Sequence, residues 1–365
     1  MDKLNLGIEI ISTLNKYSFE AYIVGGAVRD YVRGASIEDV DLTTNAMPGD
    51  IARIFSDVTN EGETYLSSRI HYKGHIFEIT TFRKDIAYID HRHPQSVPVK
   101  TLEEDLSRRD FTMNALAMNK DKEILDFYHG IEDIKSKTIR MIGNPKIRFD
   151  EDALRVLRAI EFSSRFNYLL DEEIIRSFDK DYVSFLKEEY VVSMIKKIAT
   201  NPYPIGLKYI VEYQLLRGFP FYQVVCEEAY KRNYGKNIFA LFFCLHRFLP
   251  VNTKLSKQEI RFSKDIAYFI LNEFCDESLY YGNLNCLNSA IELYNILKKK
   301  NIQLVDIRQR IESLPIHSPK DIAIDWDLVA ACDRGRITKL LEKRILNKEI
   351  ENTKEDIKKC LEIED

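Results

Sequence analysis

The stretch that decides the fold reads Gly25-Gly26-Ala27-Val28-Arg29-Asp30 and is followed nine residues on by Asp39-Val40-Asp41. A short β-type run, Ala21-Tyr22-Ile23-Val24, leads into the two glycines and is stopped by them. A brief helix should follow from about residue 27 to residue 32, and residues 40–43 should form a second strand. The order strand, glycine turn, short helix, strand predicts an α/β module at the front of the chain.

The residues of this stretch favour phosphate and metal chemistry. Two glycines after a strand let the backbone approach an anion closely, with the amides of the next helix facing it. Gly26 would supply that approach, and Arg29 could add a fork of donors to a phosphate. Asp39 and Asp41 are two apart, so on a strand both point to one face, where they repel each other unless a cation lies between them.

A third carboxylate is available on the strongest strand signal of the chain, residues 76–82, which carries Glu78. Three carboxylates suit two Mg²⁺ ions about 4 Å apart, one activating a 3′-hydroxyl and one steadying a leaving pyrophosphate. Asp39 and Asp41 alone would more often be a surface feature at a strand end. The glycine-rich stretch upstream makes a metal site the favoured interpretation over a surface feature.

A second charged group is Arg108-Arg109-Asp110. Adjacent arginines beside an aspartate can clamp a triphosphate or a ribose while the carboxylate fixes their orientation. A solvated charge cluster that opens a helix is the ordinary alternative, and this motif alone would not decide between them.

A third group lies in a helix predicted over residues 151–165, where Asp152 and Arg155 are neighbours at i, i+3. Asp accepts hydrogen bonds and Arg only donates them. Together they match the amino group and the adjacent ring nitrogen of cytosine and adenine, but not uracil or guanine in the same register. The pair could select C and A without a nucleic-acid template; an ordinary intrahelical salt bridge is the alternative.

The composition describes a globular chain of several domains. Its 365 residues are 45% apolar and 30% charged, and no apolar run approaches the roughly 18 residues of a membrane span. The start of the sequence lacks the apolar core of a secretory signal, which predicts a cytoplasmic protein. The net charge is −4, and residues 1–140 hold 18 Lys and Arg against 23 Asp and Glu, so any RNA contact would use local basic patches.

Six cysteines lie in the second part of the chain, none in a C-x-x-C pair, which makes a zinc site improbable. They should be buried or partly buried small apolar residues.

Along the chain, strand signals fade after about residue 140 and helix-period segments separated by prolines take over. This predicts an α+β arrangement of separate modules. Residues 83–98 fit neither periodicity and should form a long polar loop, a kind of segment that tends to be functional.

Taken in order, the motifs G-G-x-V-R-D, D-x-D, R-R-D-F-T-x-N-A and E-D-x-x-R-x-x-R resemble those of the class II tRNA nucleotidyltransferase and poly(A) polymerase family. The resemblance is close over residues 20–165. It implies a nucleotidyltransferase-type mixed β-sheet as catalytic head (1–140), then an all-α neck with a base-reading helix (141–200), body (201–300) and tRNA-binding tail (301–365). It also implies addition of C, C and A to the 3′ end of tRNA from CTP and ATP.

The resemblance assigns roles by motif position. Asp39 and Asp41 would bind Mg²⁺, as two ions, and Glu78 would complete the catalytic carboxylates. A further set would bind the nucleotide: Gly26, Arg29, Arg109, Asp152, Arg155 and Arg158.

One departure from the family stands three residues after Arg158, where an arginine is usual and this chain has Glu161. Arg165, one helical turn on, could substitute for it. The length of residues 83–98 argues against relatives that add only CC. An A-adding enzyme or a poly(A) polymerase shares the motifs and stays open, as does an inactive RNA-binding relative. Transfer to a small molecule would not need some 200 residues of helical extension.

Overall fold

The structure is a computed structural model that describes residues 2–60, 66–88, 90–92, 94–326 and 329–362. The chain divides into two compact units, residues 1–235 and 236–365. Each unit is described separately below. None of the helices in the described ranges has the length and apolar character that crossing a membrane requires.

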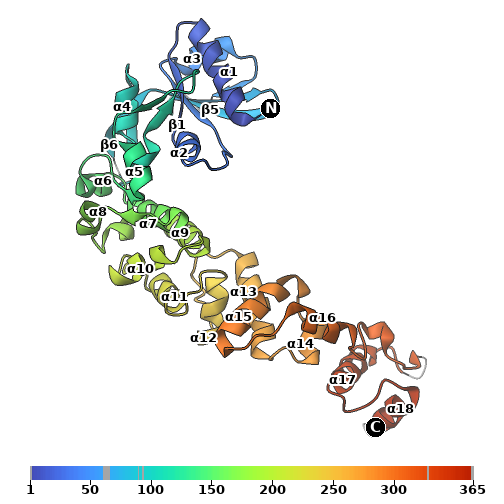
Figure 1. The fold of residues 1–365 in the computed structure, drawn as a ribbon. Coiled ribbons are helices and arrows are strands. Elements are labelled where there is room, and N and C mark those ends of the chain that lie inside the picture. Colours follow the sequence, from blue (N-terminus) through green and yellow to red (C-terminus); the bar gives the residue numbers. More distant parts are fainter. Residues whose placement is uncertain (1, 61–65, 89, 93, 327–328, 363–365) are drawn as a thin grey trace. The chain divides into compact units, whose positions relative to one another are not determined.

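The first unit is built on a mixed sheet with the strand order β3-β4-β5-β2-β1-β8-β9 in its described part (Figure 1). Strands β2 and β5 are parallel, and the other neighbours in the sheet are antiparallel. The sheet therefore confirms the predicted mixed architecture of the front part. Its strands are β1 (Ala21–Val24), β2 (Asp41–Thr44), β3 (Val58–Asn60), β4 (Ser67–Tyr72), β5 (His75–Thr81), β8 (Leu116–Met118) and β9 (Ile124–Asp126).

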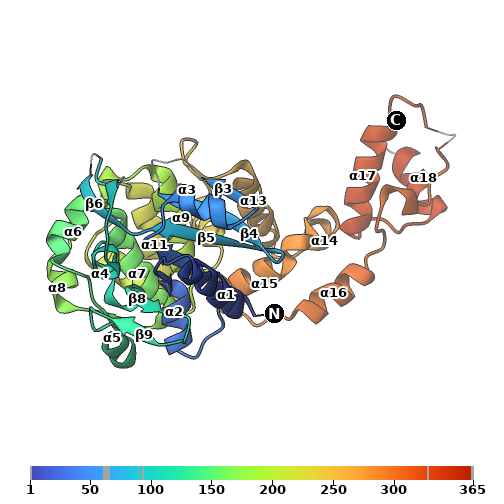
Figure 2. The same cartoon turned by 90° about the horizontal axis from the view of Figure 1, so that it is seen from above.

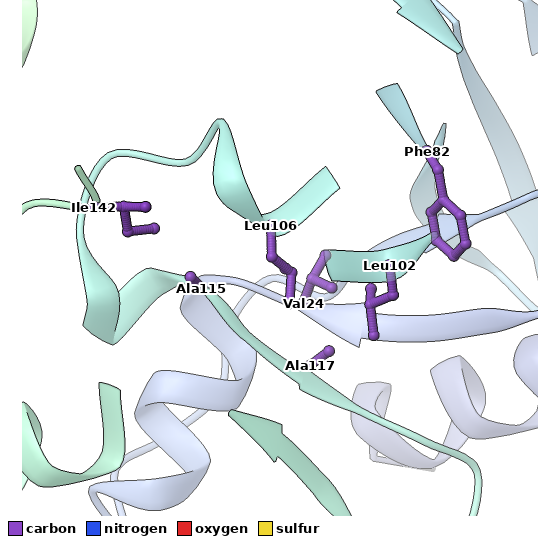
Figure 3. Packing of buried hydrophobic residues seen from close by; sticks show 7 residues of the cluster. All are labelled: Val24, Phe82, Leu102, Leu106, Ala115, Ala117 and Ile142. Atoms are coloured by element: carbon purple, nitrogen blue, oxygen red, sulfur yellow. The ribbon is translucent and has the colours of Figure 1, made fainter. Parts of the chain in front are cut away.

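Helices cover both faces of this sheet because side chains alternate along each strand. On β1, Ile23 points to α1 (Lys3–Lys16). The helix approaches closely at Gly7, since a Cβ added to Gly7 would lie 3.1 Å from Ile23 Cδ1. Helix α1 runs beside the sheet in Figure 2. Val24 points the other way and packs with Leu102 and Leu106 of α4 (Leu102–Ser107) (Figure 3).

Residues 83–98 do not form the irregular loop that the sequence predicts. In their described part they form an antiparallel hairpin of β6 (Arg83–Tyr88) and β7 (Pro94–Pro98). The pairing register shifts between Asp85 and Ala87, which breaks the two-residue alternation by which a strand is recognised in a sequence. The prediction of a loop was therefore wrong.

Helices dominate the rest of the first unit. Helices α2 and α3 connect strands of the sheet, and α5 follows β9. The helix predicted over residues 151–165 begins at Leu154, because Asp152 has the extended backbone φ −141°, ψ 99° and caps the preceding helix, which ends at Glu151. The helices are α2 (Gly26–Val32), α3 (Pro48–Ile54), α5 (Gly130–Ser136), α6 (Pro145–Glu151), α7 (Leu154–Phe166), α8 (Glu172–Arg176), α9 (Glu188–Thr200), α10 (Ile205–Glu212) and α11 (Pro220–Lys231).

The second unit is helical throughout its described secondary structure (Figure 1). This confirms the α+β class, with a mixed-sheet module followed by helices. Four cysteines of the chain are buried as expected, but Cys275 and Cys332 are exposed. The helices are α12 (Ile238–His246), α13 (Lys257–Leu271), α14 (Asp276–Tyr281), α15 (Leu287–Lys298), α16 (Leu304–Glu312), α17 (Arg334–Leu346) and α18 (Lys354–Glu362).

Candidate active site

Two carboxylates stand side by side at the centre of the sheet. Asp41 is the first residue of β2 and lies opposite Glu78 of β5 in the parallel register. Residues paired in this way share a face of the sheet. It is the face covered by α4, because the hydroxyl of Thr43, two residues after Asp41, donates to Asp105 Oδ2 at 3.2 Å.

Asp39 is not on the strand. Strand β2 begins at Asp41, so the alternation that would aim both aspartates to one face does not extend to Asp39. Its side chain is 88% exposed and accepts a hydrogen bond from Lys3 Nζ at 2.8 Å. Within the described residues, no three His, Cys, Asp or Glu side chains are gathered closely enough to hold a metal ion.

The electrostatics of Asp41 nevertheless favour a cation. Partial removal from water raises the pKa of its carboxyl group, and the charge of Glu78 raises it further against the opposing effect of Arg109. A divalent cation would relieve this repulsion, and carboxylate oxygens are the donors that Mg²⁺ prefers. Asp39 is restrained by an exposed ion pair, which contributes little and permits a turn toward Asp41. The donor set therefore fits a divalent metal.

Asp105, which sequence reasoning missed, is the buried centre of this part of the site. The carboxylate has no exposed surface and accepts hydrogen bonds from the Arg83 amide at 3.2 Å and from Arg108 Nη2 at 2.9 Å. It also lies 3.6 Å from Arg109 Nη2. Glu103-Glu104-Asp105 looks like an exposed acidic turn in the sequence, and only the fold singles out its last member.

Arg109 is a partly buried arginine with one donor unsatisfied in the described structure. Burial lowers the pKa of its guanidinium, with Asp105 opposing that shift. Its Nε is buried and has no hydrogen-bond partner among the described residues. Gly25 leaves room for the Arg109 side chain. The Gly25 backbone has φ +70°, and a Cβ added there would lie 3.0 Å from Arg109 Nη1. The Arg109 side chain is 19% exposed and lines the cavity beside glycine backbone, a setting that suits a phosphate oxygen.

Arg29 is buried, and three of its donor atoms are already engaged. Nε and Nη2 donate to the Asp30 carboxylate at 3.0 and 2.7 Å, and Nη1 donates to Asn114 Oδ1 at 2.8 Å. The guanidinium also lies over the ring of Phe166, 4.8 Å from its centroid. In this arrangement Arg29 joins α2 to α7, and it lines the cavity described below.

Asp152 and Arg155 lie at the junction of α6 and α7, and each is held by the β6–β7 hairpin. Asp152 Oδ2 accepts a hydrogen bond from Arg92 at 2.9 Å. Arg155 donates to the phenol oxygen of Tyr88 at 3.0 Å and to Glu151 at 2.8 Å. Burial raises the pKa of Tyr88 to about 12, so its phenol is neutral. The two candidate base-reading side chains thus engage other residues rather than each other.

Arg158 continues the same face of α7 and forms an ion pair with Asp110 at 2.6 Å. Burial opposes ionisation of Asp110, but Arg158, Asn114 and the Phe111 amide outweigh it and lower the pKa of the carboxyl group.

One cavity of about 540 Å³ is lined by Arg29, Arg109, Asp152, Arg155 and Arg158. Gly25, Gly26 and Asp41 lie on it together with the motif residues of α7. Among the described residues, eight arginines line it against four aspartates, a positive surplus that suits a polyphosphate. A second cavity of about 340 Å³ shares part of the lining and adds Asp39. Seven of the nine predicted site residues, Asp41 among them, line the first cavity. The other two, Asp39 and Glu78, do not.

A mixed sheet that carries adjacent carboxylates beside an arginine-lined cavity defines a nucleotidyltransferase. The sequence agrees, since residues 21–140 match the poly A polymerase head domain. A CCA-adding enzyme of Bacillus cytotoxicus is 33% identical over 384 residues, covering 97% of this chain and 96% of that protein. One of Staphylococcus epidermidis is 30% identical over 380 residues, covering 95% of each. The chain therefore belongs to the family of CCA-adding enzymes, which are tRNA nucleotidyltransferases.

Solved structures agree with this assignment. The crystal structure of the Bacillus stearothermophilus CCA-adding enzyme in complex with CTP matches with a TM-score of 0.80 and 26% identity, covering 97% of this chain and 95% of that one. The Thermotoga maritima CCA-adding enzyme complexed with tRNA_CCA has the same fold, with a TM-score of 0.69 at 16% identity. Enzymes of this family generally use a divalent metal.

Proposed function

We propose that this chain adds C, C and A to the 3′ end of tRNA from CTP and ATP, in the cytoplasm, where tRNA matures. One observation carries the proposal: a single cavity joins the carboxylate of Asp41 to the candidate base readers Asp152 and Arg155. The relatives named above support the reaction, since they are CCA-adding enzymes. The four predicted segments, head 1–140, neck 141–200, body 201–300 and tail 301–365, form part of the proposal.

The base would be read by hydrogen bonds of opposite kind. Asp152 would accept from the exocyclic amino group of cytosine or adenine, and Arg155 would donate to the neighbouring ring nitrogen. Both groups would first have to release their hydrogen bonds to Arg92 and Tyr88 of the hairpin. Arg109 and Gly26 would hold phosphates or sugar, with Arg29 and Arg158 supporting the cavity wall.

Two Mg²⁺ ions would be held by Asp39 and Asp41, with Glu78 completing the carboxylate set. When bound, the ions would favour ionisation of the attacking 3′-hydroxyl and neutralise the leaving pyrophosphate. The protein would supply the orientation of nucleotide and acceptor.

The test is extension of a tRNA that lacks its 3′ end, with CTP alone, ATP alone and both, followed by sequencing of the products. CC with CTP alone and CCA with both nucleotides supports the proposal. Incorporation of A only, or a long A tract, would indicate an A-adding enzyme or a poly(A) polymerase instead. Asp41→Asn should abolish transfer without unfolding the chain, and Asp152→Ala should admit UTP.

A further inference from the structure

Arg165, at the end of α7, has no assigned role in the reaction. We propose that its guanidinium binds the distal phosphates of the incoming nucleotide. The inference rests on the proposed function, since it specifies how the same cavity holds its triphosphate. Three features of the structure carry it: its free charge, its aromatic support and its place beside Asp41.

Arg165 differs from the other arginines of the cavity in its charge balance. Arg92, Arg109 and Arg158, for example, lie within 4.0 Å of Asp152, Asp105 and Asp110 respectively. Arg165 is exposed, and among the described residues it has no acidic partner within that distance. Within the described ranges its charge is therefore not offset by a neighbouring carboxylate, as the charges of Arg92, Arg109 and Arg158 are.

The ring of Phe166 orients this free guanidinium. Arg165 lies 5.2 Å from the ring centroid, and Arg29 and Arg33 lie 4.8 and 4.1 Å from it. Asp30 accepts hydrogen bonds from both Arg29 and Arg33 and offsets their charge. Three guanidiniums thus share one ring, and Arg165 is the member of the set without an acidic partner in the described structure. This contact with the ring leaves its N–H donors available.

The position of Arg165 identifies the part of the nucleotide that it meets. It lines both cavities, and so do Gly26, Arg29 and Asp41. The base is expected at the Asp152 end of the larger cavity and the reacting phosphate at Asp41. Phosphates beyond the reacting one therefore lie nearest to the junction where Arg165 stands.

Glu161 lies one helical turn before Arg165 but contacts α9 rather than the cavity. It is 9% exposed and accepts a hydrogen bond from Asn201 Nδ2 at 3.2 Å, at the end of α9. It does not line either cavity in the described part of the chain. Its carboxylate holds α7 to α9 and leaves the phosphate end of the cavity to Arg165.

Equilibrium binding of CTP and CMP, without acceptor, tests the inference in the full chain. A charge-assisted hydrogen bond to a phosphate is worth roughly 1.5–3 kcal/mol, which is about 10- to 100-fold in affinity. Arg165→Ala should reduce the preference for CTP over CMP by about that factor and leave CMP binding unchanged. Arg165→Lys should restore part of the preference, because it keeps a cation. Arg176→Ala, at an exposed arginine of α8, is the matched control and should change neither affinity.

The outcomes separate this inference from the proposed function. An unchanged CTP preference in Arg165→Ala overturns the inference alone. A raised KM for tRNA with an unchanged CTP preference also overturns it, by placing Arg165 on the phosphates of the acceptor. If the unaltered chain does not prefer CTP to CMP, the inference fails; if it does not extend tRNA, the proposed function fails, and the inference with it.

Discussion

At the scale of single residues, Asp105 holds together parts of the site that are far apart in the sequence. Its carboxylate joins strand β2 through Thr43, the start of β6 through the Arg83 amide, and the motif arginines Arg108 and Arg109. A buried carboxylate with this many donors is fully compensated. Removal of its charge leaves those donors buried and without their acceptor.

Asp105→Asn should therefore destabilise the fold by about 2–4 kcal/mol, because the amide turns an acceptor into a donor among buried donors. It should also raise the KM for CTP, since Arg109 loses its anchor. Urea unfolding and steady-state kinetics measure the two effects. Glu103→Gln, an exposed acid on the same helix, should change neither. Stability equal to that of the unaltered chain would contradict the role assigned to Asp105.

How far the sequence predicts the site is visible in three aspartates. The pairing of Asp41 with Glu78 could be predicted, because two β-type segments with carboxylates at matching positions can lie side by side only in a few registers. The alternation of Asp39 with Asp41 could not, because β2 begins only where it pairs with β1 and β5, at Asp41. Asp105 carries no local signal, since its burial is a property of the assembled fold.

At the scale of elements, the β6–β7 hairpin contacts both candidate base readers, Asp152 and Arg155. Its strand character was hidden by the register shift between Asp85 and Ala87. The prediction of a helix over residues 151–165 missed only its start, because Asp152 is extended. Both irregularities lie close in sequence to residues that line the cavity, Tyr88 and Asp152.

Arg92→Ala should shift the pH dependence of base selection. Burial raises the pKa of Asp152, and Arg92 is the largest of the charges that oppose the rise. Asp152 must be ionised to accept from an amino group through either oxygen, so selection weakens as the pH falls toward its pKa. Without Arg92 that pKa is higher, and the loss of selection should begin at a higher pH.

The ratio of kcat/KM for CTP to that for UTP, measured from about pH 8 to about pH 5, follows this change. The ratio should fall earlier on acidification in Arg92→Ala than in the unaltered chain. Lys84→Ala, an exposed cation in the same hairpin, is the control and should not move the profile. Superimposable profiles for Arg92→Ala and the unaltered chain would show that Arg92 does not act on Asp152.

At the scale of the whole molecule, the change from strands to helices near residue 140 does not mark the division between compact units. That division falls after residue 235. The physical reason is that α7 is tied to the sheet module by long-range contacts: Arg158 pairs with Asp110, and Arg29 of α2 lies over the ring of Phe166 in α7. The sequence pattern shows whether a segment is a strand or a helix, but contacts between distant residues determine which elements belong to one compact unit.

Residues 1–235 should consequently bind nucleotide without the rest of the chain. The cavity is lined by residues 25–165 in the described structure, all inside the first unit. The fragment should bind CTP within about threefold of the full chain, while its KM for tRNA should rise at least about tenfold, because the phosphate contacts that the tail would supply are absent. A short acceptor that consists only of the 3′ arm should lose much less. Equal KM values for tRNA in fragment and full chain would remove the tail from the acceptor-binding surface and confine recognition to the first unit.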